Sequence, residues 1–90
     1  MQHDSRFITD DLAVRLAEDS AKEKRDVRVY ILDKSPKPGR FIISKDHEEL
    51  KLKGFLRFVP MRNVIEFERT RNEDLSQVIQ IKWIADVKVF

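Results

Sequence analysis

The chain has 90 residues, of which 41% are hydrophobic and 38% are charged, with 18 Lys and Arg against 16 Asp and Glu. This length fits one domain, because half of it would be near the size at which a hydrophobic core becomes marginal. The absence of cysteine excludes disulfides, thiol catalysis and Cys-based zinc sites, and the net charge of +2 is too small to indicate a partner.

A helix is predicted over residues 10–25, and the preceding segment, residues 1–8, is expected to be flexible. Thr9 is a good N-cap, and the two acidic residues after it complement the helix dipole. Leu12 and Leu16 lie four residues apart and form one narrow apolar stripe with the alanines beside them. A stripe this narrow indicates that the helix packs with one side on a larger element.

From Asp26 onward the apolar period changes from 3.6 to 2, which predicts antiparallel β-structure over residues 26–90. We expect five or six short strands, and Gly54 indicates a bend or bulge in the middle of the third. The predicted strands cover residues 27–32, 40–45, 50–59, 63–70 and 78–84, with 87–89 resuming the last.

This order of elements predicts an α+β domain, with an N-terminal helix followed by a curved antiparallel sheet. Such a sheet either closes into a small barrel, which we favour, or stays half-open and packs on the helix. The order is similar to that of SH3-like small barrels, including the Sm-like variety, which begin with a helix. Gly39 is suitably placed for the Sm-like family, but the turn Asp46–Glu49 lacks its pattern, so the resemblance is limited to element order. The predicted core is Leu12, Leu16, Val27, Val29, Ile31, Phe41, Ile43, Leu50, Leu52, Leu56, Phe58, Ile65, Phe67, Ile79, Ile81 and Trp83.

Groups for catalysis are sparse in this sequence. No serine stands in a nucleophile-elbow pattern, and two glycines cannot build a glycine-rich phosphate cradle. The run Asp46–Glu49 contains His47 among three carboxylates, but four consecutive residues of one tight turn cannot all point at one ion. We therefore expect a non-enzymatic domain without metal, cofactor or small-molecule substrate.

The strand pattern places basic and aromatic side chains together on one outward face of the sheet. Such a face suits single-stranded nucleic acid, because cations hold phosphates and rings stack on bases. The alternative is an ordinary solvated sheet face. The predicted face consists of Arg28, Tyr30, Arg40, Lys51, Lys53, Phe55 and Arg57.

The end of the sequence is strongly apolar and predicts either an interface or the closing strand of the barrel. An uncovered apolar edge strand invites pairing with another chain, whereas pairing with the first strand would hide that edge. The candidate interface residues are Trp83, Ile84, Val87, Val89 and Phe90. Because a small domain without catalytic groups acts by contact, the leading prediction is a module that binds a protein partner or forms a homodimer. Nucleic acid is the second choice of partner.

The cellular compartment is predicted from what the sequence lacks. Small secreted domains often need disulfides, so a chain without cysteine favours a reducing compartment. Residues 1–7 lack the apolar core of a signal peptide, and no apolar run approaches the length of a membrane span. We expect a cytoplasmic protein that makes no contact with a membrane.

Overall fold

The computed structural model describes residues 8–90, so the segment predicted to be flexible lies outside the described residues except for Ile8. The described chain contains three α-helices and five strands. In chain order these are α1 (Asp10–Lys22), β1 (Val27–Ile31), β2 (Lys37–Ile42), α2 (His47–Leu52), β3 (Phe55–Pro60), α3 (Met61–Thr70), β4 (Gln77–Gln80) and β5 (Ile84–Val89). Two 3-10 helices flank β4, namely η1 (Glu73–Leu75) and η2 (Ile81–Trp83).

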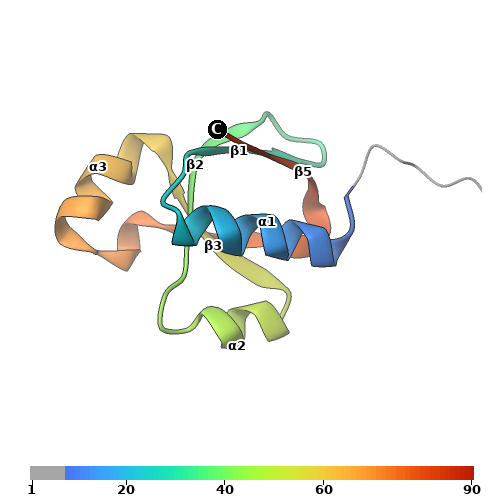
Figure 1. Cartoon of the computed structure of the whole chain (residues 1–90), viewed down its shortest axis with the longest axis horizontal. Coiled ribbons are helices and arrows are strands. Elements are labelled where there is room, and N and C mark those ends of the chain that lie inside the picture. Colours follow the sequence, from blue (N-terminus) through green and yellow to red (C-terminus); the bar gives the residue numbers. More distant parts are fainter. Residues whose placement is uncertain (1–7) are drawn as a thin grey trace, which may run out of the picture.

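The five strands form one antiparallel sheet in the order β4-β3-β2-β1-β5. This confirms an α+β domain with an N-terminal helix and a five-stranded antiparallel sheet. The closed barrel is not formed, because β4 and β5 are the two outer strands and no ladder joins them within residues 8–90. Instead, η2 leads the chain from one outer strand to the other. Figure 1 shows α1 lying across the sheet, with α2 and α3 at separate sides of it.

Small residues let α1 approach the sheet closely. Ala13 and Ala17 are buried, whereas Leu12, predicted to lie in the core, is about one-third exposed. The Thr9 side chain accepts a hydrogen bond from the backbone N–H of Leu12, so the predicted N-cap is confirmed. The helix is shorter than predicted, because Lys24 adopts the left-handed conformation that terminates helices.

Short helices replace the first part of the third predicted strand and the whole of the fourth. Residues 47–52 form α2, so the third strand begins only at residue 55. Gly54 has a φ of +91° and its N–H bonds to the Lys51 carbonyl, so it ends α2 and does not bulge a strand. Residues 61–70 form α3, which buries Val64 and leaves Ile65 83% exposed.

The main core lies between α1 and the sheet, and a smaller cluster lies between β3 and α3. Phe58 and Val29 are fully buried, and the rings of Phe58 and Phe41 meet edge to face at 5.3 Å. Several predicted core side chains are exposed instead: Leu12, Ile43, Leu52, Ile65 and Trp83. Within residues 8–90, no helix has the length and apolar character needed to cross a membrane.

Candidate functional site

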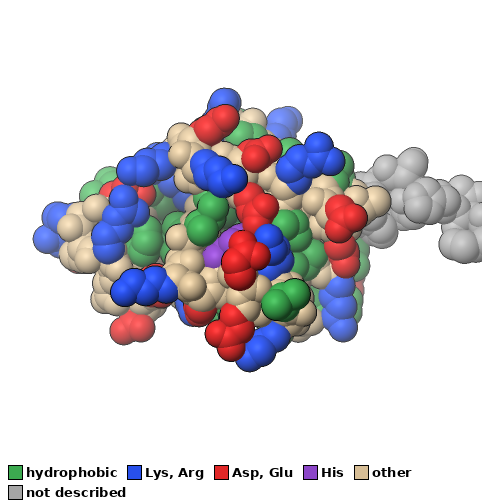
Figure 2. Space-filling model, turned by 60° about the horizontal axis from the view of Figure 1, so that its bottom comes forward, with side chains coloured by type: hydrophobic (Ala, Val, Ile, Leu, Met, Phe, Trp, Pro, Cys, Tyr) green, Lys and Arg blue, Asp and Glu red, His purple; other side chains and the backbone are tan. Residues whose placement is uncertain are grey.

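Five of the seven residues of the predicted basic and aromatic face share one face of the sheet, and the two lysines do not. Lys51 belongs to α2 and Lys53 caps it, because this part of the expected third strand is helical. Arg28 pairs with Pro38 of β2, and Arg57 of β3 pairs with Ile42 of β2, so their side chains share a face with that of Arg40. Tyr30 and Phe55 lie two residues from Arg28 and Arg57 and have the same parity. Figure 2 shows Lys and Arg side chains alternating with Asp and Glu over the side of α1 and α2. Nucleic-acid binding by this set stays a prediction.

Most of the cations in this set are held by carboxylates. A bound carboxylate neutralises the charge that a phosphate would need, and it fixes the side chain in one direction. Arg28 differs, since its guanidinium lies 5.4 Å from the centre of the Phe90 ring. The ion pairs are Arg40–Asp26 (2.7 Å), Lys51–Glu18 (2.8 Å), Lys53–Glu49 (3.2 Å) and Arg57–Asp46 (2.8 Å).

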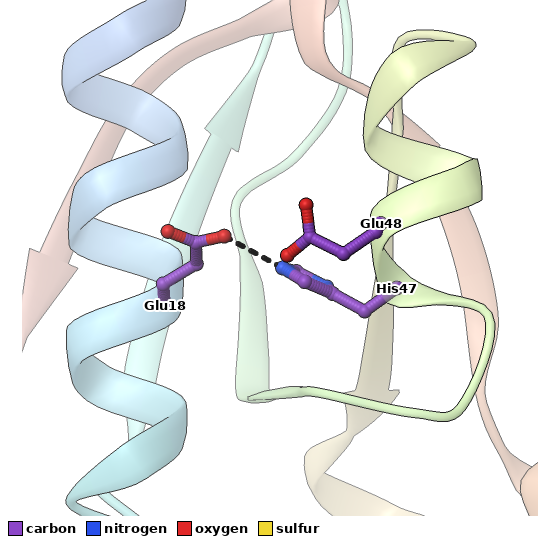
Figure 3. Close-up of side chains that lie close together, drawn as sticks. All are labelled: Glu18, His47 and Glu48. Carbon is purple, nitrogen blue, oxygen red and sulfur yellow. Dashed lines mark hydrogen bonds and ion pairs between the residues drawn. The ribbon is translucent and has the colours of Figure 1, made fainter.

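A polar cluster joins α1 to α2 at the buried His47 (Figure 3). The His47 Nε2 atom lies 2.7 Å from the Glu18 Oε2 atom, and the Lys51 ammonium lies 2.8 Å from that same oxygen. Lys51 also lies 3.2 Å from a carboxylate oxygen of Glu48. The hydrogen bonds from Lys51 and His47 hold the pKa of Glu18 below its usual value, and Glu18 in turn raises the pKa of Lys51.

This cluster also brings together donor atoms that suit a divalent cation. Glu18, His47 and Glu48 each offer one ligand atom, and these atoms lie within 4.8 Å of one another. The ammonium of Lys51 already stands beside both carboxylates, so a cation would have to displace it. We therefore assign the cluster to holding α2 against α1. Sequence reasoning missed Glu18, because it lies 29 residues before His47 and no spacing signal connects them.

Replacing Glu18 by Gln is expected to lower the free energy of unfolding at pH 7 by about 1 kcal/mol, because it removes a charged hydrogen-bond partner. The pKa of Glu18 is lowered in the folded state, so its contribution is present above its unfolded value of 4.5 and is lost as pH falls below it. Urea unfolding should show that the difference in free energy of unfolding between the parent and Glu18→Gln is smaller at pH 3 than at pH 7. An equal deficit at both pH values would contradict an electrostatic role. The exposed Asp19→Asn is the matched control.

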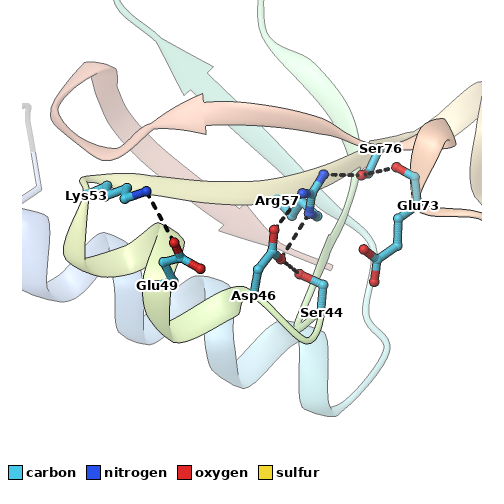
Figure 4. A network of polar contacts seen from close by, with 7 residues as sticks. All are labelled: Ser44, Asp46, Glu49, Lys53, Arg57, Glu73 and Ser76. Atoms are coloured by element: carbon cyan, nitrogen blue, oxygen red, sulfur yellow. Dashed lines mark hydrogen bonds and ion pairs between the residues drawn. The ribbon is translucent and has the colours of Figure 1, made fainter.

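A second polar cluster holds Arg57 in place between the loop before α2 and the start of β4 (Figure 4). Two guanidinium nitrogens of Arg57 bond to the two carboxylate oxygens of Asp46, and a third donates to the Ser76 hydroxyl at 3.2 Å. Ser44 donates to Asp46 as well. The hydrogen bonds from Arg57 and Ser44 hold the pKa of Asp46 far below its usual range. Arg57 thus ties three segments together.

The predicted apolar interface is divided between the core and the surface. Ile84 and Val87 are buried, and Val89 packs partly against the core. Trp83 and Phe90 remain about half exposed. β5 pairs with β1 as expected for a closing strand, but it remains an outer strand and closes no barrel. An interface formed by these residues stays a prediction. One backbone group of β5 is already bonded within the chain, since the Ile8 N–H donates to the carbonyl of Ala85 at 3.0 Å.

The other outer strand, β4, borders a hollow of about 290 Å³. All four of its residues line the hollow and no residue of β3 does, so the hollow lies on the side of β4 that faces away from β3. Ile31 at the end of β1, Lys37 at the start of β2, Lys34 from the turn between these strands and Trp83 of η2 line the hollow with it. The side chains of Val78 and Trp83 are 45% and 43% exposed.

The hydrogen-bond register shows which groups of β4 point into this hollow. The Ile81 N–H bonds to the Gly54 carbonyl at 2.8 Å, so the residue opposite Gly54 belongs to a hydrogen-bonded pair. Such pairs alternate along an antiparallel ladder, which directs the N–H and C=O groups of Ile79 toward β3. The groups of Val78 and Gln80 therefore point away from β3. Gln80 is the N-cap of η2, so its carbonyl accepts the first hydrogen bond of that 3-10 helix. The N–H and C=O of Val78 and the N–H of Gln80 have no ladder partner within residues 8–90, because β4 pairs with β3 alone.

Comparison of the chain with protein-family models, curated proteins and solved structures gives no match.

Proposed function

We propose that this domain is a protein-binding module that holds an extended segment of a partner along the outer edge of β4. The observation that carries the proposal is that the whole of β4 lines a hollow, with Trp83 and Ile31 available to apolar side chains. A strand edge next to an apolar surface is the arrangement used in β-strand addition. There, main-chain hydrogen bonds supply affinity and side-chain contacts supply specificity.

The edge of β4 suits a partner better than the edge of β5 does. Val78 presents an unpaired N–H and C=O and Gln80 an unpaired N–H, whereas Ala85 of β5 already accepts a hydrogen bond from Ile8. The side chains of β5 mainly fill the core, while Val78 and Trp83 are exposed. A peptide partner also fits better than nucleic acid, because the strand edge offers alternating donors and acceptors that match a polypeptide backbone.

The test is a selection of displayed random twelve-residue peptides on the purified domain, followed by affinity measurements on Val78→Pro and Val78→Thr. Proline removes the outward N–H and leaves the ladder to β3 intact, because that N–H does not pair with β3. We expect the proline variant to bind selected peptides at least about tenfold more weakly, since it loses a hydrogen bond and gains a steric obstacle. The threonine variant keeps the N–H and should retain the affinity.

Two outcomes would overturn the proposal. One is a selection without enriched peptides, and the other is a set of peptides that binds Val78→Pro as tightly as the parent. Circular dichroism must show that both variants are folded. Sedimentation of the free domain is a third check. If the domain forms a concentration-dependent dimer that Val78→Pro dissociates, the β4 edge binds a second copy of this chain and not a different partner.

A further inference from the structure

A further hollow adjoins the hollow beside β4 at each end of the strand. At the start of β4 it shares Lys37 and Gln77 with a hollow of about 260 Å³, and at the end it shares Gln80 with one of about 660 Å³. The three hollows adjoin one another at these shared residues, and we call the three together the β4 furrow. Its middle part is the site of the proposed function, so any role for the whole furrow rests on that proposal.

Each end of the β4 furrow offers an apolar contact. Met61 lines the end near Gln77 together with three prolines, and its side chain is 38% exposed. Leu52 lines the end near Gln80, beside Val14 of α1, and is 88% exposed. A leucine this exposed on a short helix contributes nothing to the core, so its burial by a partner would be favourable.

The charge along the β4 furrow is mainly positive. Four lining cations have no carboxylate within 4 Å among residues 8–90, and two more, Lys51 and Lys53, are paired. The acidic residues that line it are Asp10 and Asp11, both at one end. The unpaired cations are Lys34, Lys37, Arg62 and Lys82. A partner with negative charge would complement this surface along most of its length.

We infer that the partner segment is acidic, about eight to ten residues long, and carries an apolar side chain near each end. The length is set by the strand spacing of about 3.3 Å per residue, with four residues along β4 and two or three in each terminal hollow. The negative charge of the segment complements the unpaired cations, and its apolar ends contact Met61 and Leu52. Nucleic acid also carries negative charge, but it would leave the outward backbone groups of Val78 and the N–H of Gln80 unpaired.

Fluorescence anisotropy with synthetic labelled peptides tests this inference. The probes are a decapeptide of alternating Glu and Val with Leu at both ends, its central tetrapeptide Glu-Val-Glu-Val, and the decapeptide with Lys in place of Glu. We expect the decapeptide to bind at least about tenfold more tightly than either other probe, which corresponds to about 1.4 kcal/mol. Leu52→Ser should weaken the decapeptide and leave the tetrapeptide unchanged. Ile43→Ser, exposed but outside the furrow, is the control.

The charge requirement is tested by Lys34→Glu with Lys37→Glu, which should weaken the acidic decapeptide and strengthen the lysine version. Lys45→Glu, exposed and outside the furrow, is the matched control. Equal affinity for the tetrapeptide and decapeptide, both sensitive to Val78→Pro, would overturn the inference and leave the proposed function standing. If no peptide binds, including the selected ones, both the inference and the proposed function would be wrong. If decauridylate competes with the decapeptide and binds Val78→Pro as tightly as the parent, the surface would instead be a nucleic-acid surface.

Discussion

The variant Phe58→Ala is expected to lose about 3–5 kcal/mol of unfolding free energy. Phe58 is fully buried, and its ring meets Phe41 edge to face. Its backbone lies in β3, where it faces Phe41 of β2 on one side and Gln77 of β4 on the other. Truncation would leave a cavity where three strands meet. Since a small domain is stable by only about 5–15 kcal/mol, the variant should be close to unfolding at ordinary temperature.

Urea unfolding of Phe58→Ala, with Phe90→Ala as the control, measures this effect. Phe90 is about half exposed, so its truncation should change the unfolding free energy by less than about 1 kcal/mol. Thermal unfolding should show the same order, with about 4–8 °C lost per kcal/mol in a domain of this size. A loss below about 1 kcal/mol for Phe58→Ala would mean that its ring is not central to the core.

The variant Gly39→Ala is expected to destabilise the domain by about 3 kcal/mol, the upper end of the range for overpacked sites. A Cβ atom at Gly39 would lie less than 3.0 Å from the Val59 carbonyl oxygen and from two ring carbons of Phe58. A backbone oxygen cannot swing aside as the tip of a flexible side chain can, so β2 and β3 would have to separate locally. Glycine is thus required here because the two strands approach closely.

Gly54→Ala is the matched control, because it isolates the other reason for glycine. Nothing lies within 4 Å of a Cβ built at Gly54, but its φ of +91° is strained for any residue with a side chain. We expect about 1 kcal/mol for that strain. Urea unfolding of both variants should show the larger loss at Gly39. The reverse order would mean that the contact between β2 and β3 relaxes easily.

The elements with a clear period could be predicted from the sequence, and the short helices could not. Val27, Val29 and the residues after them alternate over enough positions to fix β1, and Thr9 marks the start of α1. In α2 and α3 the apolar residues are few. Val64 and Phe67 are three apart and lie on one side of α3, but with Ile65 between them they also resemble a strand. Over such short windows the two periods cannot be told apart.

The candidate site depended on facts that a single sequence does not contain. Glu18 neutralises Lys51 from 33 positions away, and Asp46 neutralises Arg57 from 11. Trp83 could be named as an interface residue, because an apolar chain end is visible in the sequence. Its proximity to β4 could not be foreseen, since that requires the sheet order and the path of η2. Charge counted along the chain therefore overestimates the charge that is free to bind.

The most direct measurement is a two-dimensional amide NMR titration of the domain with the acidic decapeptide, supported by amide hydrogen exchange. Strand addition on β4 predicts that the Val78 and Gln80 amides shift and become protected, because their N–H groups gain partners. The Ile79 amide, which points toward β3, should gain little protection. Shifts and protection that instead follow residues 84–89 would place the partner on β5 and contradict binding at β4.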